Sequence, residues 1–151
     1  MRRCVLTVVL LPLLAACGDA KTGPEALNDP AVLGAQVYRS TCQTCHGPEG
    51  KGAPGAFPPL TGNRVKGNPA PLVRIVLHGL RGPLVVNGQR YDGVMTPHGA
   101  ILSDDQIAAV LTYVRSHFGN DAPAVSPDTV AAIRATTQDR TSLYTADELA
   151  R

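Results

Sequence analysis

The sequence contains no tryptophan, and aromatic residues make up only 4% of its 151 residues. It also lacks a second Cys-x-x-Cys pair, a His-x-x-x-His pattern and any recognisable nucleic-acid-binding motif. These absences argue against a zinc module and against a nucleic-acid-binding protein. Glycine and proline are abundant instead, with 15 and 13 residues. The length permits one domain, and this composition predicts a small, loop-rich fold with few aromatic side chains in its core.

The most informative motif is the pentapeptide Cys42-Gln43-Thr44-Cys45-His46, which reads C-x-x-C-H, the attachment pattern of a c-type haem. Two thiols add across the two vinyl groups of one porphyrin, and the following imidazole reaches the iron as the proximal ligand. The two cysteines could instead be half of a zinc site or a dithiol redox pair, but neither a second ligand pair nor a βαβ pattern is present. We therefore predict one covalent haem c, held by Cys42 and Cys45, with His46 on the iron.

The N-terminal residues read as an export signal. A basic start is followed by an apolar run from Cys4 to Ala16 that is too short to span a bilayer as a helix. Leu14-Ala15-Ala16-Cys17 resembles the lipobox of bacterial lipoproteins, which predicts a signal peptide over 1–16, lipid on Cys17 and a lipidated tether over 17–28. The alternative is an ordinary signal peptide that leaves a free thiol. The lipid would anchor the protein to a membrane on the periplasmic side of a bacterial cell envelope.

This assignment uses every cysteine of the chain. Cys4 would leave with the signal peptide, Cys17 would carry lipid, and Cys42 and Cys45 would carry haem. None remains for a disulfide, although an exported chain could have used one. We therefore expect covalent haem, rather than a disulfide, to crosslink the small core.

Two capped helices flank a middle that is rich in glycine and proline. The first is expected to begin at Asp29-Pro30 and to run into the haem motif, and the second begins at the capping box Ser103–Gln106. Between them we expect loops over 47–71 and 81–99, separated by a short helix over 72–77. The pattern predicts that the two flanking helices cross while the middle encloses the haem.

The domain boundaries follow from these elements. We expect a haem-binding domain over 29–120 and a C-terminal extension over 121–151. Pro127-Asp128 opens a short helix in that extension, and a second short piece begins near Thr145.

The second axial ligand can be argued by elimination. Met95 is the only methionine left once Met1 is removed with the signal. A soft thioether suits low-spin iron and raises its reduction potential, although an isolated methionine often only fills a gap in a core. His98 is the main alternative, whereas His78 lies in a Gly-rich turn and His117 lies at the end of the last helix of the domain. We predict ligation by Met95.

Basic residues gather in the middle of the chain, where no acidic residue interrupts them, and acidic residues prevail from Asp92 onward. The basic stretch is either a set of solvated side chains or a basic face near the haem, which would meet haem propionates or an acidic partner. Its members are Lys51, Arg64, Lys66, Arg74, Arg81 and Arg90.

Residues 30–120 resemble a class I cytochrome c, and in particular the small cytochrome c modules of bacterial respiratory complexes. The matching segments are CQTCHGPEGKG, FPPLTGN, VLHGLRGPLVVNGQRYDGVMTPHG and LSDDQIAAVLTYVRSHFGN. The resemblance implies an all-α fold, with crossed N- and C-terminal helices, short helices and long loops around one haem. It also implies that the Pro59 carbonyl accepts a hydrogen bond from His46, that Leu60 packs on the haem, and that Gly34 and Tyr38 cross Val110 and Tyr113.

A haem with both axial positions filled offers no open site for a substrate, so the resemblance implies an electron carrier rather than an enzyme. Its partners would be the redox proteins that donate and accept one electron in a respiratory chain, with no small-molecule substrate and no nucleic acid. Two alternatives stay open. The chain could be a cytochrome subunit fixed in a dehydrogenase or oxidase complex, or it could be a haem protein that binds or senses a ligand.

Overall fold

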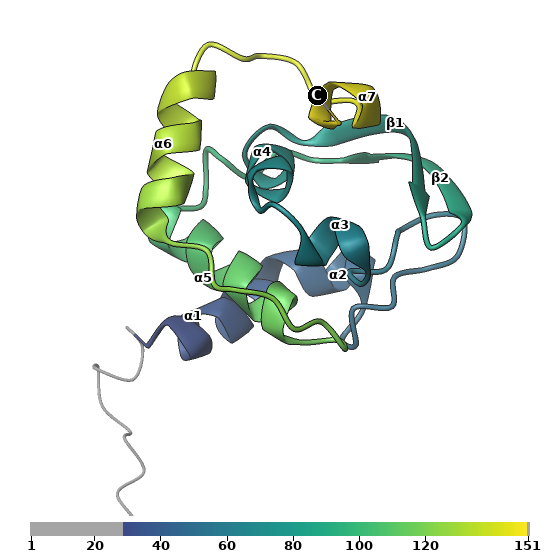
Figure 1. Ribbon diagram of the computed structural model, residues 1–151, viewed down its shortest axis with the longest axis horizontal. Coiled ribbons are helices and arrows are strands. Elements are labelled where there is room, and N and C mark those ends of the chain that lie inside the picture. The colour runs from purple at the N-terminus through teal and green to yellow at the C-terminus, as the bar shows by residue number, and fades with distance from the viewer. Residues whose placement is uncertain (1–28, 151) are drawn as a thin grey trace, which may run out of the picture.

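The computed structural model describes residues 29–150. Its elements are α1 (Pro30–Val37), a π-helical turn η2 (Tyr38–Cys42), α2 (Gln43–His46), α3 (Asn63–Lys66), α4 (Ala70–His78), β1 (Leu80–Val86), β2 (Gln89–Met95), α5 (Asp104–Ser116), α6 (Pro127–Thr137) and α7 (Ala146–Leu149) (Figure 1). The signal peptide predicted over 1–16 and the lipid site predicted at Cys17 lie outside the described residues.

Both flanking helices begin where their caps predict. The Asp29 side chain accepts a hydrogen bond from the backbone N–H of Ala31 at 2.9 Å, and α1 follows from Pro30. The Ser103 hydroxyl accepts from the N–H of Gln106, whose side chain accepts in return from the N–H of Ser103 at 2.9 Å. This reciprocal pair satisfies two of the free N–H groups at the start of α5.

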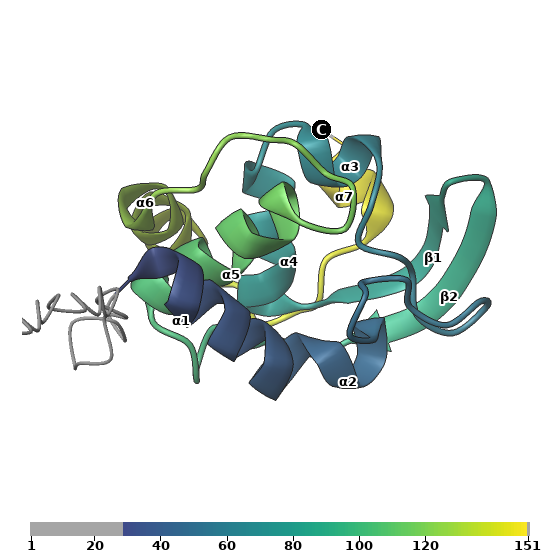
Figure 2. The same cartoon turned by 90° about the horizontal axis from the view of Figure 1, so that it is seen from below.

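The crossing of α1 and α5 depends on a missing side chain. A Cβ at Gly34 would lie 2.9 Å from the Ala109 carbonyl carbon and 2.9 Å from the Tyr113 Cβ, so only glycine allows the two helices this close (Figure 2). One turn later, the rings of Tyr38 and Tyr113 pack with centroids 5.4 Å apart. The predicted crossing is confirmed, and the backbone that Gly34 meets is that of Ala109.

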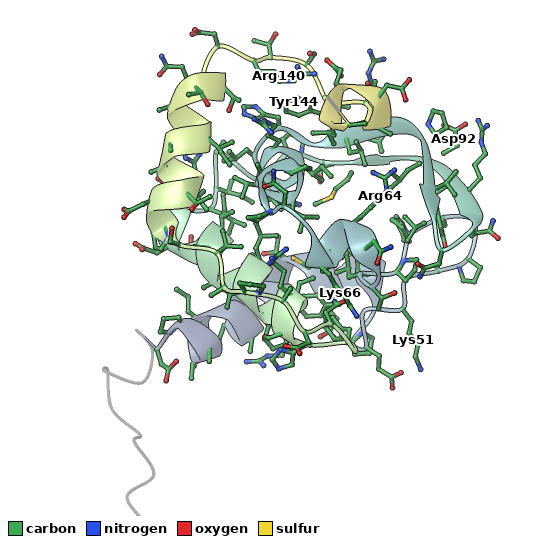
Figure 3. The ribbon with its side chains drawn as sticks, viewed as in Figure 1. Lys51, Arg64, Lys66, Asp92, Arg140 and Tyr144 are labelled. Carbon is green, nitrogen blue, oxygen red and sulfur yellow. The ribbon has the colours of Figure 1, made fainter. Side chains whose placement is uncertain are left out.

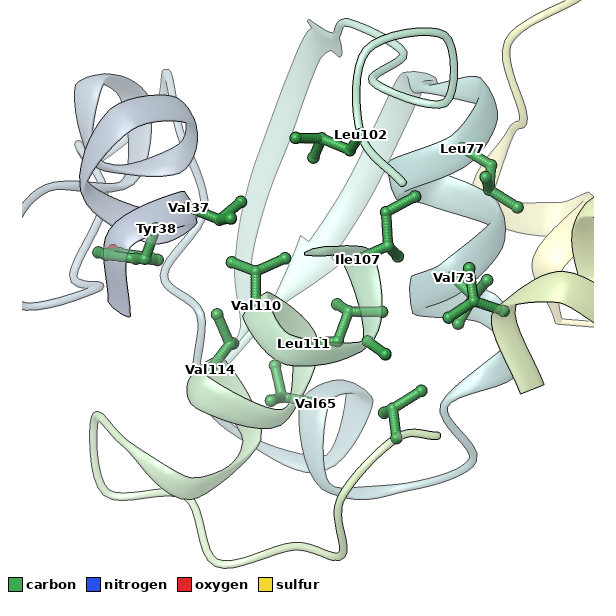
Figure 4. Packing of buried hydrophobic residues seen from close by; sticks show 13 residues of the cluster. Val37, Tyr38, Val65, Val73, Leu77, Leu102, Ile107, Val110, Leu111 and Val114 are labelled. Atoms are coloured by element: carbon green, nitrogen blue, oxygen red, sulfur yellow. The ribbon is translucent and has the colours of Figure 1, made fainter. Parts of the chain in front are cut away.

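The apolar core lies between α5 and the elements around it. Ile107, Val110, Leu111 and Val114 form the inward stripe of α5 at helical spacing, and all four are buried. Figure 4 shows them between side chains from α1 and α4. Because α5 contributes a whole face to the core, it is the element against which the others are positioned.

The prediction of an all-α fold is wrong. Most of the segment 81–99, which was expected as a loop, belongs to an antiparallel hairpin of β1 and β2, in which Leu80 pairs with Met95 and Val86 pairs with Gln89. Its turn is Asn87-Gly88, and both residues have a positive φ, 50° and 80°. An Asn-Gly pair between two β runs favours this type of tight hairpin turn, which matches the twist of the strands. Gly82, Pro83 and Gly93 break up the β pattern in the sequence.

The C-terminal extension packs on the domain. The helix predicted from Pro127 is confirmed as α6, which lies against α4 and α5 on the side of the molecule away from the hairpin (Figure 1). After α6 the chain crosses to β1, where Tyr144 forms a parallel bridge with Leu80, and α7 follows. The Thr145 hydroxyl caps α7, as the sequence suggests.

Candidate functional site

His46 is held in a defined orientation at the end of α2. Its ring is buried, and its Nδ1 lies 2.9 Å from the carbonyl oxygen of Pro58. Because a carbonyl oxygen can only accept, Nδ1 carries the proton and Nε2 presents its lone pair. Burial lowers the pKa of His46, and the hydrogen bond to Pro58 opposes that effect. The arrangement provides a neutral imidazole ready to bind a metal ion through Nε2.

The acceptor for His46 was expected at Pro59 and is instead Pro58. Two consecutive prolines offer two carbonyl groups, and the backbone of the preceding loop decides between them. Ala53 and Phe57 form an antiparallel bridge, and the Leu60 N–H donates to the Gly50 carbonyl at 2.8 Å. These contacts fix the loop so that the Pro58 carbonyl faces the imidazole.

The two thiols of the motif lie beside His46. The π-helical turn η2 ends at Cys42, and the regular turn of α2 then carries Cys45 and His46. Cys45 is exposed, whereas Cys42 is partly buried, and burial together with the charge on Cys45 raises the pKa of Cys42 to about 11. Neither cysteine forms a disulfide within the described residues, and both line the same cavity as His46.

That cavity is a cleft with two lobes of about 190 and 290 Å³. Together they reach the range of roughly 300–1,000 Å³ that cofactor clefts occupy. Cys42, His46 and Met95 line both lobes. The larger lobe has mostly apolar walls, which include Pro59, Leu60, Leu72, Ile75, Val76, Val110, Leu111 and Val114. The donor set and the apolar walls therefore fit a flat iron porphyrin, with thiols for its vinyl groups and with nitrogen and sulfur for its iron.

Met95 is the last residue of β2, so the hairpin that the sequence failed to predict delivers the predicted ligand to the cleft. The three rival histidines are less suited. His98 lines only the smaller lobe. His78 Nε2 lies 2.7 Å from the Thr137 hydroxyl, and His117 stacks on the Tyr113 ring at 3.9 Å. Both lobes are thus lined by Met95 and His46, together with the attachment residue Cys42.

Sequence reasoning missed Arg115, which is only 2% exposed. Its guanidinium donates to the carbonyl groups of Pro123 and Gly67, each at 2.9 Å, and to that of Val65. It forms no ion pair with any acidic residue of the part that the structure describes. The sequence did contain a pattern that indicates the burial of Arg115, because Arg115 lies four residues after Leu111 and so falls on the buried stripe of α5.

The zinc alternative finds no support in the described residues. Over 29–150, no group of three or more His, Cys, Asp or Glu side chains could hold a metal ion. Among the helices of the same residues, none is both long and apolar enough to cross a membrane.

Comparison with known proteins identifies the fold family. A family model described as Cytochrome c matches residues 31–118. The chain belongs to the cytochrome c family. Proteins of this family hold haem c covalently and transfer electrons, and Cys42 and Cys45 of this cytochrome c stand in the attachment motif for one haem.

Curated relatives include a cytochrome c and subunits of a dehydrogenase and of an oxidase. Cytochrome c-552 of Thermus thermophilus is 40% identical over 92 residues, which cover 58% of this chain and 69% of the relative. The fructose dehydrogenase cytochrome subunit of Gluconobacter japonicus is 36% identical over 110 residues, or 68% of this chain and 22% of the relative. The cbb3-type cytochrome c oxidase subunit FixP of Azorhizobium caulinodans is 33% identical over 111 residues, or 70% of this chain and 36% of the relative. The chain therefore spans only a minor part of the two subunits.

Proposed function

We propose that this protein is a lipid-anchored mono-haem cytochrome c that carries single electrons between respiratory redox proteins on the periplasmic side of a bacterial envelope. The observation that carries the proposal is the cleft in which Cys42, His46 and Met95 line both lobes. The haem supplies the one-electron chemistry when it is bound. The chain attaches it through two thiols, orients His46 through Pro58 and presents the Met95 thioether.

Ligation by Met95 is tested by substitution. Met95→Ala should lower the reduction potential and let carbon monoxide bind the ferrous protein, because a soft thioether both raises the potential and occupies the sixth position. Met95→His should also lower the potential while the iron stays low-spin and closed to carbon monoxide. His98→Ala is the matched control, since His98 lines only the smaller lobe. If His98→Ala changes the potential or opens the iron and Met95→Ala does neither, the assignment of the ligand is wrong.

A fixed subunit is the second candidate, and the names of two relatives favour it. One is the cytochrome subunit of fructose dehydrogenase, and the other is a subunit of a cbb3-type cytochrome c oxidase. In that role this chain would stay bound to one enzyme and pass electrons onward from it. Purification from the native membrane in mild detergent decides between the two roles. A free carrier elutes alone, and a subunit elutes with an enzyme in constant proportion.

A further inference from the structure

Met95 is tied to the C-terminal extension through the sheet. Leu80 of β1 pairs with Met95 on one edge and forms a parallel bridge with Tyr144 on the other. The Arg81 N–H donates to the Tyr144 carbonyl at 2.8 Å, and the Tyr144 N–H donates to the Gly79 carbonyl at 3.1 Å. Tyr144, Leu80 and Met95 therefore form one row across three neighbouring backbones.

A side-chain contact reinforces this row. We call residues 138–149 the C-terminal strap. A Cβ at Gly79 would collide with Leu143 of the strap and lie 2.5 Å from the carbonyl oxygen of Met95. The absence of a side chain at Gly79 thus brings the strap and the backbone of Met95 together at one point.

Arg140 connects several residues within the strap to one another. Its guanidinium carbon lies 3.6 Å from the centroid of the Tyr144 ring, a cation–π contact that Figure 3 shows beside α7. The same guanidinium donates to the carbonyl of Ser142 at 2.8 Å and to the carboxylate of Glu148 at 2.9 Å. Tyr144 is buried beneath it. The strap is therefore a closed turn around one aromatic side chain rather than a loose tail.

The chain that follows Met95 is held from α6. Arg134 donates to the carbonyl groups of Gly99 and Leu102, the latter at 2.9 Å, and forms an ion pair with Asp104 at 2.8 Å. The extension thus holds β1, which pairs with Met95, and also holds the backbone that follows Met95. It also reaches the cleft itself, because Leu149 of α7 lines the larger lobe.

We propose that the C-terminal strap, together with Arg134, is a positioning device that keeps the Met95 thioether on the haem iron, with Tyr144 as its central residue. The inference rests on the proposed ligation by Met95. A thioether binds iron through one weak bond, so the fraction of time it is bound depends on how far its strand end is free to move. Holding the strand that pairs with Met95 and the segment that follows it reduces that freedom before the bond forms.

The test compares single variants of the full chain with haem attached. Tyr144→Ala should raise the fraction of ferrous protein that binds carbon monoxide by about tenfold, the factor expected for the loss of a desolvated cation–π contact. It should also weaken the thioether-to-iron charge-transfer band of the ferric protein. Tyr144→Phe keeps the ring and should restore both readouts. Arg140→Met removes the same cation–π contact by changing a more exposed residue. This variant replaces Tyr144→Ala in the test if Tyr144→Ala fails to fold.

Val130→Ala is the control for general destabilisation, because Val130 is fully buried in α6 and lies outside the strap residues 138–149. If Tyr144→Ala and Arg140→Met lower the unfolding midpoint as Val130→Ala does, yet leave carbon monoxide binding and the band unchanged, the strap only stabilises the fold and the proposal is overturned. If wild type and Met95→Ala bind carbon monoxide equally, the ligation itself fails, and that outcome is distinct.

Discussion

Gly34 lies so close to Ala109 that a Cβ at position 34 would stand 2.9 Å from the Ala109 carbonyl carbon. We predict that Gly34→Ala destabilises the protein by about 1–3 kcal/mol, because overpacking two rigid backbones outweighs the better helix propensity of alanine. The measurement is the free energy of unfolding in denaturant. Gly93→Ala is the control, since a Cβ there would lie an ordinary 3.6 Å from the nearest atom, the Ala56 carbonyl oxygen. Equal effects of the two substitutions would show that the crossing tolerates a side chain.

The second prediction concerns alkaline pH. The Tyr38 hydroxyl donates to the Gly47 carbonyl at 2.6 Å, and burial is the largest cause that raises the pKa of Tyr38 to about 12. Because the folded-state pKa lies above the unfolded value near 10, the contribution of Tyr38 to stability is full below pH 10. It is lost as pH rises from about 10 to about 12, by on the order of 2 kcal/mol.

Tyr38→Phe should therefore be less stable than wild type at pH 7, by roughly 1 kcal/mol for the lost hydrogen bond. The difference between the two proteins should shrink as pH rises above 10. Denaturant midpoints measured from pH 7 to pH 11 follow it. Tyr113→Phe removes a hydroxyl from the same group of rings and serves as the control. A difference that stays constant over this range would mean that Tyr38 does not couple folding to pH.

Local rules predicted the starts of α1 and α5 because each of these two helices has a side-chain cap within three residues. Ser103 with Gln106, and Asp29 before Pro30, are patterns that need no knowledge of the rest of the chain. The hairpin was missed for the opposite reason. Its Asn87-Gly88 turn is a local signal, but Pro83 and two glycines within the strands weaken the β pattern, and tertiary contact with the extension supports β1.

The candidate site likewise has residues that the sequence predicts and residues that only the folded chain brings to the site. The attachment pair and His46 are adjacent in sequence, so spacing alone predicts them. The acceptor of His46 depends on the course of a loop 12 residues away, which is why Pro58 was misassigned by one position. Leu149 reaches the cleft only because the strap crosses the molecule, and no pattern near Leu149 signals it.

The third prediction concerns Cys17, which lies outside the described residues. If the lipobox is used, mass spectrometry of the purified protein should show acyl chains on Cys17 as the first residue. Cys17→Ser should release a soluble protein that still carries haem, because more than one hydrophobic anchor is needed for stable membrane binding. The haem absorbance of the soluble and membrane fractions measures the release. An unmodified Cys17 in the mature wild type would contradict the lipid assignment.

The last prediction concerns the basic stretch as a docking surface. The structure pairs two of its members with acidic neighbours just outside it, Lys51 with Glu49 at 2.6 Å and Arg90 with Asp92 at 2.8 Å. Arg64, Lys66 and Arg81 are exposed and form no ion pair within residues 29–150, and Arg64 lines the larger lobe of the cleft (Figure 3). Local positive charge therefore remains beside the site where electrons would leave the haem. It should attract anions and act mainly on the rate of encounter.

Small redox probes test this without a known partner. Oxidation of the reduced protein by ferricyanide, an anion, should slow as salt rises, since screening acts over about 10 Å at 0.1 M ionic strength. Lys51→Glu with Lys66→Glu should slow the reaction by roughly tenfold at low salt, and Lys51→Arg with Lys66→Arg should leave it unchanged. A cationic ruthenium ammine should show the reverse dependence. Rates that are flat in salt, and equal in the Glu and Arg variants, would mean that the basic stretch is only a solvated surface. Partners would then dock through exposed apolar side chains nearby, such as Phe57 and Val94, which both line the smaller lobe.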